Sequence, residues 1–267
     1  MGFSPPNKVN SSSAASIVSR MDLGISQRTA VVAAASAGLG FASAQALANE
    51  GVRVVICSRD ADRVADAAKK IGNGCVGIVG DVSTTEGALA FIREAKTILG
   101  DIDIVVANGG GPPAGNFAST DLDLYPAAIE RSMLATVAMC KEVIPRMQER
   151  GWGRIVAITS TAVRQPFANL ILSSTARAGL TAFLKTVATE VASNGITVNT
   201  VQPGTHATDR IKQLYGSMEG AAEGIPAGVV GDPKDFGSVV AFLCSEQAKF
   251  VTGTHLQVDG GSYPGLI

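Results

Sequence analysis

Three residues in the second half of the chain offer hydroxyl and guanidinium groups at a spacing suited to chemistry. Ser160 ends an apolar run, and Ser173 and Arg177 follow on a helical pattern. Residues four apart share one helical face, so Ser173 and Arg177 should point the same way. A serine hydroxyl can polarise a carbonyl oxygen, whereas arginine keeps its charge and releases no proton near neutrality. Alternatively, Ser173, Ser174 and Thr175 are small residues that permit close helix packing.

A glycine-containing loop lies between the first predicted strand and the first predicted helix. Its candidate phosphate-binding residues are Ser36, Gly38, Leu39 and Gly40. Gly38 would let the backbone approach a pyrophosphate, and Gly40 would let the helix pack closely on the strand. The amino end of the helix would add free amides and the positive end of its dipole. The alternative is a turn that merely connects strand to helix.

The second predicted strand ends in Ser58-Arg59-Asp60. Dinucleotide-binding sheets that prefer NAD place an acid at this strand end to bind the ribose 2′-hydroxyl. Here Ser58 is followed by Arg59, whose planar cation suits a 2′-phosphate, so the sequence predicts NADP(H) in preference to NAD(H). The alternative is a solvated Arg59 that pairs with Asp60.

Short apolar runs alternate with longer helical patterns, which is typical of an α/β fold. The predicted strands are 29–34, 52–57, 75–79, 103–107, 153–159, 196–201 and 255–258. The predicted helices are Phe41–Glu50, Ala61–Ile71, Thr85–Leu99, Leu122–Arg150, Asn169–Ser193 and Pro233–Cys244. We expect one doubly wound, seven-stranded parallel sheet with helices on both faces and a ligand crevice at the carboxyl ends of its strands.

Composition narrows the classes of function. The 267 residues are 46% hydrophobic and 17% charged with a formal net charge of −1, which predicts one large domain and neither a nucleic-acid nor a membrane partner. The four cysteines form no CxxC pair, which favours a reducing compartment and a cytoplasmic location. With only two histidines, we predict no metal site.

The first residues differ from the rest because they carry Pro5-Pro6 and Ser11-Ser12-Ser13. Residues 1–21 are predicted to be a flexible arm, and residues 22–267 a single domain. The simplest interpretation is that Met21 is a native start and that residues 1–20 are an upstream extension. A weak transit peptide is the alternative.

Several motifs, in order and at matching spacing, resemble those of the short-chain dehydrogenase/reductase family over about residues 22–263. The phosphate loop matches except that Ala33-Ala34 replaces the usual Thr-Gly, and the strand Gly153–Ser160 matches with its terminal serine. The resemblance implies a single-domain Rossmann fold that resembles 3-oxoacyl-carrier-protein reductases. It also implies further cofactor-binding residues, namely Asp81 and Val82 beside adenine, Asn108, Gly109, Pro203, Gly204 and Thr208.

The catalytic residues that the resemblance implies are largely substituted. Ser160 falls on the catalytic serine, but Ser173 falls on the tyrosine, Arg177 on the lysine and Ser132 on the helix asparagine. Arg177 would still bind the nicotinamide ribose. A replacement acid would have to come from the 205–230 region, the predicted substrate lid.

Two hypotheses for the function follow. The first is an NADP(H)-dependent oxidoreductase acting on a small-molecule carbonyl or alcohol, 3-oxoacyl compounds included, with His206 or Tyr215 as candidate replacement acids. The second is a nucleotide-binding protein without redox turnover, acting as a sensor or oligomeric partner. Under either, the apolar surface of the long helices predicts a homotetramer or homodimer.

Overall fold

The computed structural model describes residues 21–209, 211 and 217–266. Residues 1–20 of the predicted arm therefore lie outside the described part of the chain. The strands are β1 (Thr29–Val32), β2 (Arg53–Ser58), β3 (Val76–Val79), β4 (Ile104–Ala107), β5 (Gly153–Ile158), β6 (Ile196–Pro203) and β7 (His255–Val258). They form one parallel sheet in the order β3-β2-β1-β4-β5-β6-β7, which confirms the predicted fold.

Alternate residues of the central strands supply two hydrophobic cores. Val31 and Val55 belong to one core and Val32 and Ile56 to the other, and all four are fully buried. A strand buried on both faces is apolar along its whole length. This explains why the strands read as short continuous apolar runs in the sequence.

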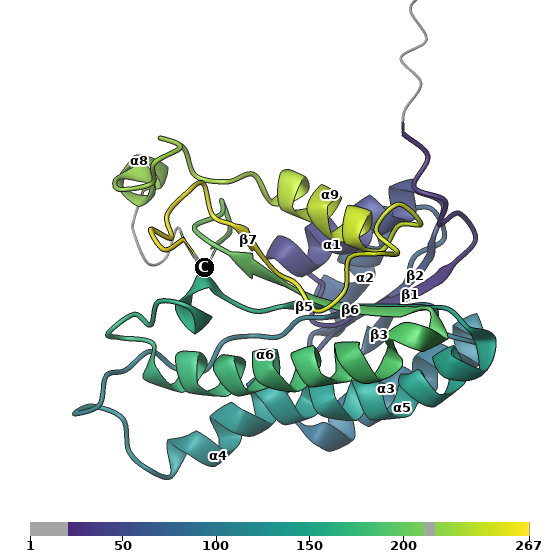
Figure 1. Cartoon of the computed structure of the whole chain (residues 1–267), viewed down its shortest axis with the longest axis horizontal. Helices are drawn as coiled ribbons and strands as arrows, with labels where there is room; N and C mark the ends of the chain where they lie inside the picture. The colour runs from purple at the N-terminus through teal and green to yellow at the C-terminus, as the bar shows by residue number, and fades with distance from the viewer. Residues whose placement is uncertain (1–20, 210, 212–216, 267) are drawn as a thin grey trace, which may run out of the picture.

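Helices cover both faces of the sheet (Figure 1). They are α1 (Gly38–Asn49), α2 (Ala61–Ile71), α3 (Thr85–Leu99), α4 (Leu124–Ile129), α5 (Ala135–Arg150), α6 (Ile171–Val191), α8 (Met218–Ala222) and α9 (Pro233–Leu243), with the short helical segments η1 (Glu130–Leu134), η2 (Thr161–Val163) and η3 (Ala192–Asn194). Residues of α1, α2 and α9 belong to one core, and those of α3, α5 and α6 to the other. None of the helices in the described ranges is long and apolar enough to cross a bilayer.

The predicted helix ends agree with the structure where capping residues mark them. Asp60 accepts a hydrogen bond from the Arg63 amide at the start of α2, and Gly72 ends that helix with a φ of 68°. The bounds of α2 and α3 match the predictions. By contrast, the single helix predicted over 122–150 is wrong, because a π-helical segment, η1, separates α4 from α5.

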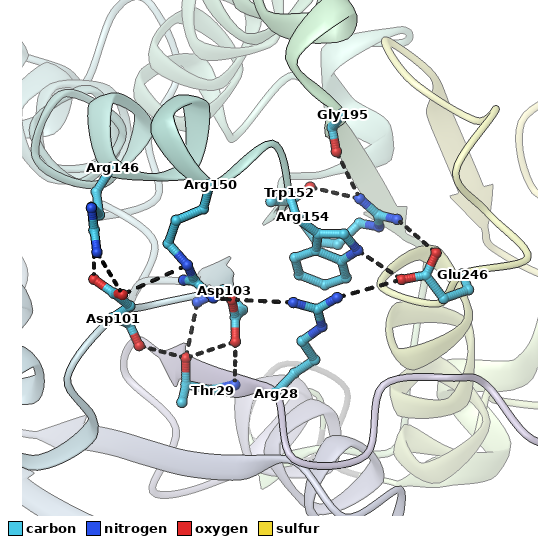
Figure 2. A network of polar contacts seen from close by, with 11 residues as sticks. Arg28, Thr29, Asp101, Asp103, Arg146, Arg150, Trp152, Arg154, Gly195 and Glu246 are labelled. Carbon is cyan, nitrogen blue, oxygen red and sulfur yellow. Dashed lines mark hydrogen bonds and ion pairs between the residues drawn. The ribbon is translucent and has the colours of Figure 1, made fainter.

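A polar network ties together the amino edge of the sheet (Figure 2). The ring of Trp152 lies between two guanidinium groups, with its centroid 3.8 Å from Cζ of Arg28 and 4.3 Å from Cζ of Arg154. The indole Nε1 donates to Oε1 of Glu246 at 2.7 Å. Burial lowers the pKa of Arg154 against the attraction of Glu246. These contacts join the amino ends of β1, β4 and β5, whereas open parallel sheets bind ligands at the opposite, carboxyl ends of their strands.

Candidate active site

The phosphate-loop candidate is a left-handed turn that leads directly into α1. Ala34 has a φ of 48° and Gly38 a φ of 60°. A Cβ on Gly40 would lie 2.6 Å from Nδ2 of Asn108, so glycine is required there. Helix α1 begins at Gly38 rather than at the predicted Phe41, and neither a capping side chain nor a first-turn acid occupies its amino end. That end therefore presents amides suited to an anion.

Asn108, at the end of β4, holds this loop in place. Its Nδ2 donates to the carbonyl oxygens of Ala33 at 3.2 Å and Ala34 at 3.1 Å. The Asn108 side chain thus holds the backbone at Ala34, the residue with the left-handed conformation. The loop is consequently preorganised before any ligand arrives.

The end of β2 leaves one arginine exposed beside the loop. Ser36 Oγ donates to Ser58 Oγ at 3.0 Å, which joins the loop to this strand end. The Asp60 carboxylate caps α2, and no ion pair joins it to Arg59 within the described ranges. The alternative of an Arg59–Asp60 pair is therefore wrong. Arg63 lines the same cleft, a neighbour that sequence reasoning missed.

Asp81 and Val82 follow β3 at the next strand end. Oδ1 of Asp81 accepts from the Ser83 amide at 2.9 Å. Partial burial opposes ionisation of Asp81, but the Ser83 hydrogen bonds and the charges of Arg59 and Arg131 together lower its pKa. A helix does begin nearby, but Thr84 and not Asp81 caps α3.

At the other end of the cleft, Ser160 follows β5 and begins η2. Its Oγ accepts from the Ala162 amide at 3.1 Å, which leaves the hydroxyl proton available to a ligand. Arg177, on α6, donates from Nη1 to the carbonyl oxygens of Ile158 at 2.8 Å and Thr159 at 3.1 Å. Arg177 therefore braces the turn that presents Ser160.

Ser173 and Ser132 complete this end. Ser173 is 9% exposed and lines the cleft from α6. Ser132 lies in η1, and its buried Oγ has no hydrogen-bond partner among the described residues. A chamber of about 10 Å³, large enough for one water molecule, lies between Ser132 and Arg177. The family's asparagine and tyrosine positions thus hold small hydroxyls.

The segment after β6 closes the cleft from the opposite side. Pro203, Gly204 and Thr208 line it, and a Cβ on Gly204 would lie 2.7 Å from Cα of Asp259. His206 is 4% exposed, packs edge-on against Phe236 at 5.1 Å and is not among the lining residues.

The structure describes the thiols but not the second candidate acid. Tyr215 lies outside the described residues. The four cysteines are free, and burial raises the pKa of Cys57 to about 12. The structure therefore gives the proton-donor role neither to His206 nor to a thiolate.

One cleft of about 890 Å³ unites the two ends. It is lined by Ser36, Gly38, Leu39, Ser58, Arg59, Asp81, Val82, Asn108, Gly109, Ser160, Ser173, Arg177, Pro203, Gly204 and Thr208. Of the predicted cofactor-binding residues only Gly40 is absent from this lining, because it packs beneath the loop. Ser132 lines the small chamber instead, and His206 lines neither. Sequence reasoning missed Arg63, Arg131, Phe167, Asn169 and Leu170, which line the cleft from neighbouring elements. A resemblance that matches motifs gives no signal for such residues.

Comparison with known proteins bears directly on this architecture. The family model described as enoyl-(acyl carrier protein) reductase matches residues 33–263. Nodulation protein G of Azospirillum brasilense is 34% identical over 244 residues, covering 89% of this chain and 98% of that protein. Acetoacetyl-CoA reductase of Cupriavidus necator is 32% identical over 246 residues, covering 90% of this chain and all of that protein.

A solved structure agrees with these sequence matches. L-sorbose reductase of Gluconobacter frateurii, complexed with NADPH and L-sorbose, superimposes with a TM-score of 0.87 at 30% identity. The alignment covers 92% of this chain and all of that one. Because the family model, the relatives and the solved structure each match over nearly the whole length, the chain belongs to the short-chain dehydrogenase/reductase family of oxidoreductases.

Proposed function

We propose that the chain is an NADP(H)-dependent oxidoreductase that interconverts a carbonyl and an alcohol, with 3-oxoacyl-like compounds as candidate substrates. The observation that carries this proposal is the single cleft of about 890 Å³. Its one end has the phosphate loop and Arg59, and its other end has Ser160 and Ser173. A dinucleotide and a small substrate can therefore meet in one space.

The residues present fit the cofactor. Gly38 lines the cleft and allows a close backbone approach, Gly40 lets α1 pack against Asn108, and the uncapped amino end of α1 suits a pyrophosphate. Arg59 is not paired with Asp60 and suits a 2′-phosphate. L-sorbose reductase, which shares the fold at 30% identity, is described in complex with NADPH. When bound, the nicotinamide supplies or accepts the hydride.

The chain's own residues have unequal roles in the proposed chemistry. Ser160 donates its hydroxyl proton to the substrate oxygen and so polarises the carbonyl. Arg177 fixes the Ser160 turn through the carbonyl oxygens of Ile158 and Thr159 and adds positive charge. Ser173 is a much weaker acid than tyrosine, so water is the proton source proposed for the product oxygen. The apolar side chains of Phe167 and Leu170 would cover the body of the substrate.

A second candidate is hydride addition to a carbon–carbon double bond conjugated to a carbonyl. It is favoured by one observation: the described lining of the cleft contains no tyrosine, histidine, lysine or cysteine. In this reaction the hydride bonds to the β-carbon, the π electrons move to the oxygen, and water later protonates the α-carbon. The resulting enolate oxygen is far less basic than an alkoxide, so polarisation by Ser160 and a fixed cation suffices. The matching family model is described by an enoyl reductase.

The test is a titration with NADPH and NADH, followed by a substrate panel with the nucleotide that binds. The panel pairs each 3-oxoacyl thioester with the enoyl thioester of the same chain length. Oxidation of NADPH by the 3-oxoacyl compounds supports the first candidate, and oxidation by the enoyl compounds alone supports the second. Binding without turnover on either would favour the sensor hypothesis. Absence of binding at millimolar nucleotide would refute both candidate reactions.

A further inference from the structure

Arg131 occupies a position in the cleft that the proposed reaction leaves unused. It is the second residue of the π-helical segment η1, which joins α4 to α5. Its side chain is half-buried and lines both the large cleft and the small chamber beneath it. Single π-helical turns inside helices occur frequently at functional sites.

Among the described residues no acceptor is bonded to the guanidinium of Arg131, although its charge acts on Asp81. The guanidinium makes no hydrogen bond or salt bridge with any residue in the described ranges. The neighbouring acid, Glu130, is occupied, because its Oε1 accepts from the Thr85 amide at 3.2 Å at the start of α3. A half-buried cation without a bonded partner is costly, so its retention points to a ligand.

The surroundings of Arg131 identify which part of a ligand it faces. Its chamber is shared with Val82, Asn108 and the glycine backbone at Gly109. Its carbonyl oxygen lies 3.9 Å from the position of a Cβ on Gly109. Val82, Gly109 and Arg131 also line the large cleft, where Val82 and the glycine backbone offer an uncharged surface. The candidate phosphate-binding groups lie elsewhere in that cleft, at the amino end of α1 and after β2. The wall between Val82 and Arg131 therefore suits a planar ring.

We propose that Arg131 is a cofactor-binding residue whose guanidinium lies against the face of the adenine base, opposite Val82. This rests on the proposed function, in which the cleft binds NADP(H). Guanidinium planes stack on bases and add a cation–π attraction. The charges of Arg131 and Arg59 both act on Asp81, which follows the same strand as Val82, so Arg131 belongs to this end of the cleft.

The test is calorimetric titration of the full chain with three probes: ADP-ribose, 2′-phospho-ADP-ribose and inorganic pyrophosphate. Arg131→Met should weaken the two adenosine probes by the same factor, about 5- to 30-fold, and leave pyrophosphate binding unchanged. Arg131→Lys keeps the positive charge but loses the planar guanidinium group. Its affinity for the two adenosine probes should lie between those of the wild type and Arg131→Met. Arg93→Met, on the exposed side of α3, is the matched control and should change nothing.

Three results would overturn the assignment. A loss confined to 2′-phospho-ADP-ribose would make Arg131 a 2′-phosphate ligand, and a loss of pyrophosphate binding would make it a pyrophosphate ligand. Equal affinities in wild type, Arg131→Lys and Arg131→Met would remove it from the site. A wild-type chain that binds none of the probes and no NADPH would instead refute the proposed function itself.

Discussion

Replacing Ala34 with glycine should stabilise the protein, although glycine usually destabilises a folded chain. Ala34 has a φ of 48°, and an L-residue with a side chain pays about 1–2 kcal/mol in the left-handed region. Glycine removes that strain but adds about 0.4–1 kcal/mol of unfolded-state freedom. The Ala34 amide donates to Cys57 Sγ and the Ala34 carbonyl accepts from Asn108 Nδ2, so a substitution that changes only the side chain keeps both hydrogen bonds.

The net expectation is a gain of about 0.5–1 kcal/mol, which corresponds to a rise in Tm of roughly 1–4 °C for a chain of this size. Thermal and urea denaturation at fixed protein concentration measure it. The matched control is Ala33→Gly, the same change one residue earlier. Ala33 is 1% exposed and has no positive φ, so its loss of a buried methyl should lower stability by about 1–2 kcal/mol. If Ala34→Gly lowers Tm as Ala33→Gly does, the strain argument is wrong.

Four further outcomes are expected. Arg59→Ala should weaken NADPH binding about 10-fold or more and spare NADH, and an unchanged affinity ratio measured by titration would exclude Arg59 as the 2′-phosphate ligand. The double substitution Ser173→Tyr, Arg177→Lys should raise turnover of a 3-oxoacyl thioester about 10²–10⁴-fold while NADPH still binds; no increase would mean that the tyrosine was not limiting. Burial lowers the pKa of His206 and of His255, so the free energy of unfolding should fall as pH drops below about 6.5, where the unfolded chain takes up protons, and His206→Gln should reduce that slope in urea titrations between pH 7 and 5. Sedimentation should detect a dimer or tetramer, and a concentration-independent monomer would contradict the oligomer prediction.

The sheet could be predicted because each strand has its own signal in the local sequence. Each central strand is buried on both faces, so each appears as a short apolar run, and capping residues such as Asp60 and Thr84 mark the helix starts. The start of α1 could not be predicted in the same way. Gly38 and Gly40 favour a loop by propensity, yet packing makes them the first turn of a helix. Tertiary contacts override propensity there.

Site residues could be predicted where they follow strand ends, and Ser173 and Arg177 on α6 could be predicted from the family resemblance. Ser58, Asp81, Asn108 and Ser160 each end or follow a strand, and parallel strands bring their carboxyl ends together. Arg131 reaches the same cleft from a π-helical turn, which has no distinguishing sequence pattern. Its place therefore depends on packing between elements that are distant in sequence.

The two edges of the sheet differ in a way that bears on function. At the amino edge, Arg28 and Arg154 flank Trp152, and the ring nitrogen is bonded to Glu246 (Figure 2). At the carboxyl edge, Ala34 is held in a left-handed conformation and Arg131 has no bonded partner among the described residues. Folded chains keep strain and unpaired charge chiefly where a ligand compensates for them. The end of the cleft with the phosphate-loop candidate therefore retains features of a functional site even though the tyrosine and lysine positions are substituted. Loss of catalysis alone would not explain the strained Ala34 and the unbonded Arg131.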